Sequence, residues 1–251
     1  MSKKQSTISL LYSQCLSAGN FEFDNTHVKR ACELTRFGNP YDVTKVDSTR
    51  ILPQKLIDDD MCIVHLGQGR HRFVKGIDIV YHQFETIPVE NQKKWEYRES
   101  ILNNINSSES NSLFVAYNQR ILHDFLYEDI AASPKAYGAH RTKANISYLI
   151  GNTVVEAERM QIEIDLTLEY NGNICIFEAK NGSPDDFNIF QLFNPFKHYT
   201  MQSKSRKVKS ISCCYLVRKG QSMKLYLYKF NEKSPSTIKL IKYAEYILEK
   251  R

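Results

Sequence analysis

The chain has no hydrophobic run that approaches the roughly 20 residues a membrane-spanning helix needs, so we expect no contact with a membrane. Its first residues lead into a mixed segment without an apolar core or a small-residue cleavage site, so no signal peptide is expected. The six cysteines include no C-x-x-C pair and no zinc-binding pattern. These absences predict a reduced intracellular protein located in the cytoplasm.

The motifs of several enzyme classes are also missing. None of the seven histidines has H-E-x-x-H spacing, which argues against a zinc protease. No serine lies in a G-x-S-x-G elbow, and Gly67-x-Gly69 lacks the rest of a dinucleotide-binding fingerprint. Charged residues are therefore the better candidates for chemistry.

The charge of the chain is segregated along its length. The first 110 residues carry 14 Lys or Arg and 14 Asp or Glu, so the remaining 20 basic and 14 acidic residues give the whole net charge of +6. Acidic residues are absent between Ile130 and Val155 and between Phe187 and Asn231, and they are concentrated from Glu156 to Asp186. Basic segments around an acidic centre suit an enzyme that holds a polyanion and a metal cation, although solvated faces could produce the same pattern.

The sequence pattern of residues 1–110 predicts a mixed module of helices and a hairpin. The expected elements are helices near Ile8–Leu16 and over Asn25–Thr35, and strands Met61–Leu66 and His71–Lys75 around the turn Gly67–Arg70. A winged-helix-like arrangement would bring Arg70 and Arg72 to DNA. An ordinary hairpin with a solvated tip is the alternative. The balanced charge of residues 1–110 argues against this half of the chain as the main phosphate-binding surface.

The polar stretch Asn103–Ser112 has the composition of a linker, so we place a domain boundary near residue 110 and a second domain at 111–251. This domain is predicted to be of the α/β class. Its expected elements are a helix over Leu113–Ile130, strands Gln161–Tyr170 and Ile174–Ala179, strands Ile211–Val217 and Lys224–Phe230, and a helix over Ile238–Lys250. The segment Asp186–Met201 is expected to be helical in its first part, with Pro195 kinking or interrupting the helix.

The most informative residues lie on two strands that a turn joins. Apolar and polar residues alternate along Gln161–Tyr170, which places Asp165 on the polar face. Glu178 and Lys180 are two residues apart on the next strand and so share a face. Asn171-Gly172 is a strong signal for a hairpin turn that would bring the strands together. We therefore expect two carboxylates and an ammonium to converge.

Such a patch is suited to magnesium chemistry. Mg²⁺ takes oxygen ligands and is usually held by one or two carboxylates with water and substrate phosphate. Asp165, Glu178 and the main-chain carbonyl of Ala179 would supply ligands, with Glu163 as a candidate for a second metal and Mn²⁺ as a substitute ion. Lys180 would orient or help to deprotonate the attacking water and offset charge in the transition state. The alternative is a polar sheet face without catalysis.

Asp165, twelve intervening residues and Glu178-Ala-Lys180 resemble the PD-(D/E)xK nuclease motif. Gln191 matches a glutamine often found on the helix after this motif. The sequence departs from the literal motif because Ile164, rather than proline, precedes Asp165. The resemblance covers roughly Leu113–Phe230. It implies a restriction-endonuclease-like core, a central mixed sheet flanked by helices, with Asp165, Glu178 and Lys180 as catalytic residues and Gln191 in support.

Within this superfamily the chain is most similar to a type II restriction endonuclease, because it has no helicase or ATPase motif and carries a separate module that could read sequence. This resemblance implies double-stranded DNA as substrate, a homodimer, a prokaryotic source and a DNA methyltransferase as the functional counterpart. The candidate DNA-binding residues are Arg70, Arg72, Lys135, His140, Arg141, Lys143, Lys204, Arg206 and Lys207.

Three other functions remain open from the sequence. A repair, recombination or mobile-element nuclease would use the same catalytic residues but would recognise DNA structure. A non-catalytic DNA-binding protein could be built on a nuclease-like core. An interaction protein that does not bind nucleic acid is the third alternative, and salt-insensitive or absent DNA binding would support it.

Overall fold

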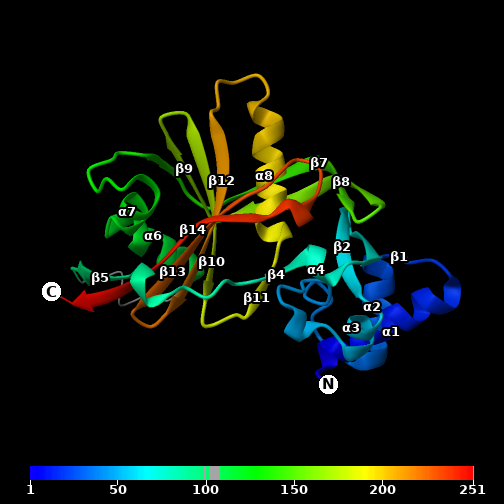
Figure 1. The fold of residues 1–251 in the computed structure, drawn as a ribbon. Coiled ribbons are helices and arrows are strands. Elements are labelled where there is room, and N and C mark those ends of the chain that lie inside the picture. The colour runs from blue at the N-terminus through cyan, green and yellow to red at the C-terminus, as the bar shows by residue number, and fades with distance from the viewer. Residues whose placement is uncertain (99, 102–107, 251) are drawn as a thin grey trace.

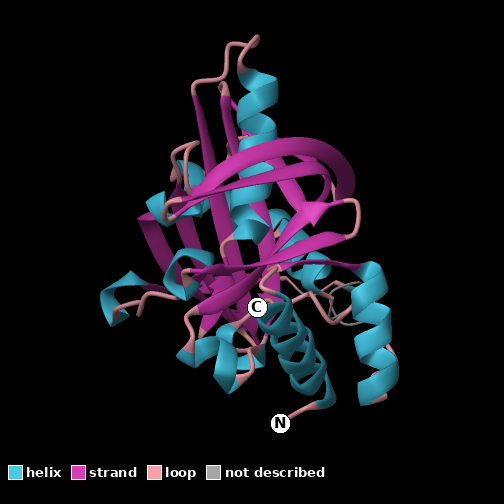
Figure 2. Cartoon of the chain, turned by 90° about the vertical axis from the view of Figure 1, so that its right-hand side faces the viewer, coloured by secondary structure: helices cyan, strands magenta, loops and turns pink. Residues whose placement is uncertain are grey.

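A computed structural model describes residues 1–98, 100–101 and 108–250, and within them a seven-stranded mixed sheet is flanked by helices (Figures 1 and 2). The strands of this sheet, in spatial order, are β5 (Gln92–Tyr97), β14 (Lys239–Lys250), β13 (Ser222–Lys229), β12 (Ser210–Lys219), β10 (Asn173–Asn181), β9 (Leu166–Tyr170) and β6 (Lys135–Tyr137). Strands β10 and β12 are parallel, as are β14 and β5, while the other neighbours are antiparallel. The expected α/β class with a mixed central sheet is confirmed.

Helices cover both faces of this sheet. Helices α6 (Glu109–Asn118) and α7 (Ile121–Tyr127) pack on one face, and α8 (Phe190–Ser203) packs on the other. Strand β10 shows the alternation, because Phe177 and Ala179 belong to the core under α6 and α7 whereas Ile176 belongs to the core on the α8 side. The face of β10 that carries its polar residues is therefore the α8 face.

The N-terminal part forms the expected helices and hairpin. Its elements are α1 (Lys3–Ala18), β1 (Glu22–Asp24), α2 (Asn25–Thr35), the 3-10 helix η1 (Thr49–Ile51), α3 (Gln54–Asp58), β2 (Met61–Gly67) and β3 (Arg70–Lys75). The three strands form a small sheet in the order β1-β3-β2. Helix α1 is stabilised at its N-terminus by a capping box of Ser2 and Gln5. Helix α2 is capped by Asp24, whose carboxylate accepts from two backbone N–H groups.

A long two-stranded ribbon connects the two parts of the molecule. Strand β7 (His140–Ile150) pairs with β8 (Thr153–Ile164), and the ribbon reaches from the sheet toward the hairpin β2–β3 (Figure 1). The remaining short elements are α4 (Ile77–Val80), β4 (Tyr81–Gln83), η2 (Val89–Asn91), β11 (Asp186–Asn188) and η3 (Pro235–Thr237). Strand β4 pairs with β11, and β5 pairs with β14, so residues 81–97 are built into the sheets of the second half.

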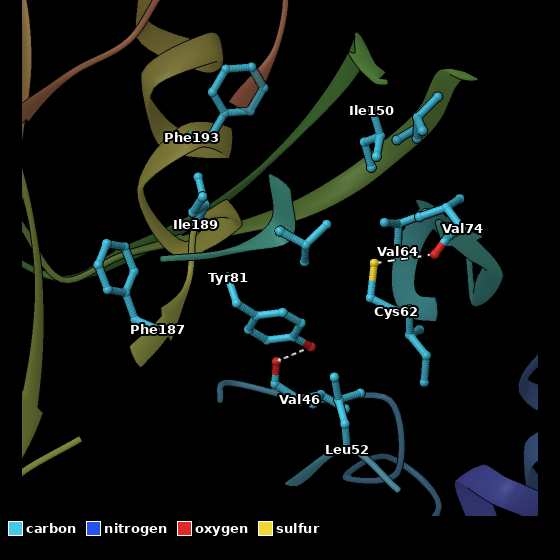
Figure 3. Packing of buried hydrophobic residues seen from close by; sticks show 14 of the residues in the cluster. Val46, Leu52, Cys62, Val64, Val74, Tyr81, Ile150, Phe187, Ile189 and Phe193 are labelled. Carbon is cyan, nitrogen blue, oxygen red and sulfur yellow. Dashed lines mark hydrogen bonds between the residues drawn. The ribbon is translucent and has the colours of Figure 1, made fainter. Parts of the chain in front are cut away.

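One hydrophobic core joins the N-terminal part to the α8 face of the sheet. Leu52 and Val64 of the N-terminal part belong to this core together with Ile150 of the ribbon and Ile189, which precedes α8. Figure 3 shows these residues, with Tyr81 between Leu52 and Ile189. The hydroxyl of Tyr81 donates to the carbonyl of Val46 at 3.2 Å. The two halves of the chain are therefore in contact through buried residues. Residues 103–107 of the polar stretch expected as a linker lie outside the described residues, and residues 109–112 belong to helix α6.

The structure corrects several expectations about single elements. Residues 239–250 form strand β14 and not a helix, because they pair with β13 and β5, and this pairing overrides a helical sequence pattern. The helix expected over Leu113–Ile130 is divided into α6 and α7 at Arg120, which adopts a left-handed backbone with φ 63°. Helix α8 continues through Pro195 to Ser203, although residues 186–188 before it form a strand.

All six cysteines are buried and none forms a disulfide, so they pack as small hydrophobic side chains. None of the helices in the part of the chain that the structure describes combines the length and apolarity needed to span a bilayer.

Replacing Gly67 with alanine is expected to destabilise the protein by about 2–4 kcal/mol, since a rigid backbone neighbour must move. A Cβ at Gly67 would lie 1.9 Å from the carbonyl oxygen of Glu158 on β8, and the residue has φ 79°. Gly151 is the matched control, because it has φ 55° and no atom within 4 Å of a built Cβ. Urea unfolding should show a smaller loss for Gly151→Ala, and equal losses would contradict close docking of the hairpin on β8.

Candidate active site

A cleft of about 920 Å³ lies between the N-terminal part, the ribbon β7–β8 and the start of α8. We call it the central cleft. Asp165, Glu178, Lys180 and Gln191 all line it, so the structure brings together the residues that the sequence analysis selected. The hairpin turn at residues 67–70 and the side chain of Asp47 line the same cleft. Both halves of the chain therefore contribute to one site.

Asp165 lies at the junction between the ribbon and the main sheet. The single expected strand is interrupted here, because β8 ends at Ile164 and β9 begins at Leu166. The carboxylate of Asp165 is half-buried and accepts from the backbone N–H of Ala179 at 3.2 Å, which fixes it beside β10. Burial raises the pKa of Asp165, while the hydrogen bond from Ala179 acts in the opposite direction.

Glu178 points to the α8 face of the sheet and is held by a chain of hydrogen bonds. Its Oε1 accepts from Gln191 Nε2 at 2.9 Å, and Gln191 Oε1 accepts from the hydroxyl of Tyr215 at 3.1 Å. Tyr215 lies beside Glu178 on the parallel strand β12. Burial and the nearby charge of Asp165 both raise the pKa of Glu178 well above its usual range. The Gln191 side chain thus orients a carboxylate that is desolvated and repelled by its neighbour.

Lys180 lies among three carboxylates. Its Nζ is 3.2 Å from Glu109 Oε2, 3.8 Å from Asp47 Oδ2 and 3.9 Å from Glu178 Oε1. Burial by itself would lower the pKa of Lys180, but the charges of Glu178, Asp47 and Glu109 raise it overall. The side chain is therefore held as an ammonium, which favours charge neutralisation and water orientation over proton acceptance.

The donor set of the site fits a hard divalent cation. Asp165 and Glu178 present carboxylate oxygens in one place, and the repulsion that raises the pKa of Glu178 is the interaction a bound cation would relieve. Among the described residues no group of three or more His, Cys, Asp or Glu has the arrangement of a metal site. Two carboxylates completed by a main-chain carbonyl and water suit Mg²⁺, whereas a closed zinc site is not formed.

Glu163 lines the central cleft but is engaged in other contacts. Its carboxylate is 3.1 Å from Arg141 Nε across the ribbon and accepts from Gln161 Nε2 at 3.1 Å. This pairing weakens the expectation that Glu163 holds a second metal, and it engages Arg141 within the protein.

The candidate DNA-binding residues fall into three groups. Arg70 and Lys143 line the central cleft. Arg72 and Lys204, again with Arg70, line a second cleft of about 930 Å³ together with residues of the ribbon and of α8, and we call it the side cleft. Neither cleft is lined by the remaining candidates, which are exposed at the sheet edge, on β7 or after α8: Lys135, His140, Arg141, Arg206 and Lys207.

Residues from distant parts of the chain also approach the site, and no sequence motif points to them. Asp47 follows Val46 in an irregular segment of the N-terminal part, and its carbonyl accepts from the N–H of Asn188 at 2.9 Å next to α8. Glu109 begins α6, and its place in a polar stretch suggested a linker. Arg159 on β8 also lines the central cleft, in a left-handed conformation with φ 47°. No local pattern marks these residues, because each becomes relevant only through the fold.

Comparison with protein families covers almost the whole chain. A family model described as a domain of unknown function, DUF6997, matches residues 76–247. The chain belongs to this family. A second model, described as a domain of unknown function, DUF6996, matches residues 8–73. No curated protein matches the chain, and no solved structure does.

The two matched regions divide the central cleft between them. The DUF6997 region carries Asp165, Glu178, Lys180 and Gln191, while the DUF6996 region carries Asp47 and the hairpin turn. The regions meet between residues 73 and 76, ahead of the boundary expected near residue 110.

Proposed function

We propose that the protein is a Mg²⁺-dependent endonuclease that hydrolyses phosphodiester bonds in double-stranded DNA. The observation that carries this proposal is the convergence of Asp165, Glu178 and Lys180 on one wall of the central cleft. The resemblance of these residues to the PD-(D/E)xK motif gives the convergence a chemical interpretation. The specific fold proposed for residues 111–251 is the restriction-endonuclease-like core.

Each residue of the site would have its own role in hydrolysis. Asp165 and Glu178, with the carbonyl of Ala179, would hold Mg²⁺, which when bound supplies polarisation of the scissile phosphate and activation of a water molecule. Gln191 keeps one carboxylate oxygen of Glu178 in a fixed direction. The ammonium of Lys180 would hold the attacking water and offset negative charge that develops on the phosphate.

The charges around the cleft support a nucleic-acid substrate. Arg70, Lys143 and Arg159 line the cleft together with the acidic centre, and none of the three has an ion-pair partner among residues 1–98, 100–101 and 108–250. Unpaired cations on the wall of a cleft can contact phosphates, which dominate the affinity of proteins for DNA.

We further propose that the enzyme cuts at a specific sequence, as a type II restriction enzyme whose counterpart is a DNA methyltransferase. The N-terminal part brings a rigid hairpin turn to the catalytic cleft, which suits recognition close to the cut. One such site cuts one strand, so we propose that a homodimer cuts both strands of the duplex.

Incubation of the full-length protein with plasmid DNA tests the function directly. Discrete fragments are expected with Mg²⁺ or Mn²⁺, and none with EDTA. Smeared products, or cutting confined to branched DNA, would instead indicate a structure-specific nuclease. DNA binding that persists without any cleavage would indicate a non-catalytic binding protein, and no salt-dependent binding would exclude a nucleic-acid function.

A further inference from the structure

We propose that the hairpin turn Gly67–Arg70 reads base pairs next to the scissile phosphate, with Gln68 and Arg70 as the reading side chains. This inference rests on the proposed function in that it takes the central cleft to hold DNA. The position of the turn is the first observation, because the turn lines the same cleft as Asp165, Glu178 and Lys180. The turn belongs to the N-terminal part and the catalytic residues to the sheet.

The backbone of the turn is strained at a residue that is not glycine. Gln68 and Gly69 are its two central residues, and both have positive φ, 52° and 75°. Two-residue hairpin turns with positive φ at both positions favour Asn-Gly or Asp-Gly, and a longer side chain at the first position is unfavourable. Strained residues are concentrated at functional sites, where the surrounding structure fixes them.

Three contacts fix the turn in the cleft. Gly67 lies so close to β8 that any side chain at this position would overlap the carbonyl of Glu158. The N–H of Asn25 donates to the carbonyl of Gly69 at 2.9 Å. The Oδ1 of Asn25 is 3.1 Å from Nε2 of the buried His71. The turn is therefore held by the ribbon on one side and by helix α2 on the other.

The two side chains at the tip are available for a ligand. Gln68 and Arg70 are exposed, and neither side chain has a hydrogen-bond or ion-pair partner in the described part of the chain. A glutamine forms a bidentate pair with adenine, and an arginine does so with guanine, through the major-groove edge of the base. A fixed turn with both residues two positions apart can therefore discriminate neighbouring base pairs.

The ribbon on which the turn docks also offers positioning contacts. Arg159 is held in its left-handed conformation by a hydrogen bond from its N–H to Asn145 Oδ1 at 2.8 Å, and Lys143 lies on the paired strand. These two cations lie on the ribbon and not on the turn, and phosphate contacts from them would fix the register of the duplex without selecting a sequence.

Selection from a library of DNA duplexes with a randomised centre tests the proposal. The selection uses the full-length Asp165→Asn protein, so that recovered DNA is uncut. Adding Gln68→Ala or Arg70→Ala is expected to reduce the preference at one base pair by about 10- to 100-fold each, and to leave the other positions unchanged. Gln68→Asn, which tolerates positive φ, provides a second variant with a shorter reach.

Arg72→Ala is the matched control, because Arg72 lies on the same hairpin but lines the side cleft. It removes the same charge and is expected to weaken binding without changing the selected sequence. A uniform loss of affinity in the Gln68 and Arg70 variants, with an unchanged sequence profile, would overturn the proposal. The proposal would also be overturned if the Asp165→Asn protein itself selected no preferred base at any position. Because the readout is binding, a selective protein that never cleaves would refute the endonuclease proposal and not the reading role.

Discussion

Asp165→Asn is expected to reduce plasmid cleavage by at least about 10³-fold while the protein remains folded. The substitution keeps an oxygen that can accept from the N–H of Ala179, so the junction between β8 and β9 should persist. It removes the negative charge that a hard cation requires, and loss of several kcal/mol of metal-assisted stabilisation corresponds to three or more decades in rate.

Cleavage rates and calorimetric Mn²⁺ binding measure this effect, and both should fall together. Glu163→Gln provides the matched control on the same strand face, because its carboxylate is paired with Arg141. We expect this control to retain most of its activity if a single metal is held by Asp165 and Glu178. Cleavage by Asp165→Asn at more than about a tenth of the parent rate would refute the assignment of the site.

Lys180→Gln is expected to lower the cleavage rate constant by about 10²- to 10⁴-fold, with little change in the affinity for DNA. The ammonium of Lys180 faces Glu109, Asp47 and Glu178, and the neutral amide leaves these carboxylates without their cation. The variant should also bind Mn²⁺ at least as tightly as the parent, because a competing positive charge is gone.

Lys180→Arg separates charge from geometry at this position. A guanidinium restores the charge but spreads it over a planar fork, so it cannot hold a water molecule as a compact ammonium does. We therefore expect only partial recovery of the single-turnover rate. If Lys180→Gln instead loses DNA affinity and keeps its rate constant, Lys180 binds phosphate and does not act in the chemical step.

The catalytic residues could be found from the sequence because their signal is local. Asp165 directly precedes β9, and the Asn-Gly turn connects β9 to β10, where Glu178 and Lys180 share a face. A few neighbouring residues are enough to define that geometry. The hairpin of the N-terminal part was visible for the same reason. Gln191 was selected from its resemblance to a motif, and its hydrogen bond to Glu178 supports that choice.

Other features required the tertiary structure. The segment 239–250 has a helical pattern, and only its pairing between β13 and β5 makes it a strand. Asp47 and Glu109 form ion pairs with Lys180, although they lie 133 and 71 residues before it in the chain. Such contacts depend on packing between elements, for which a sequence has no short-range signal.

The sequence by itself determined that two carboxylates and an ammonium share one face of a hairpin, because strand alternation is a property of neighbouring residues. The tertiary structure decided that this face lines the central cleft and which distant residues line the cleft with it. It placed the turn Gly67–Arg70 in the lining of the same cleft through the close approach of Gly67 to β8. That approach depends on backbone packing between distant segments, which hydrophobic pattern and charge do not encode.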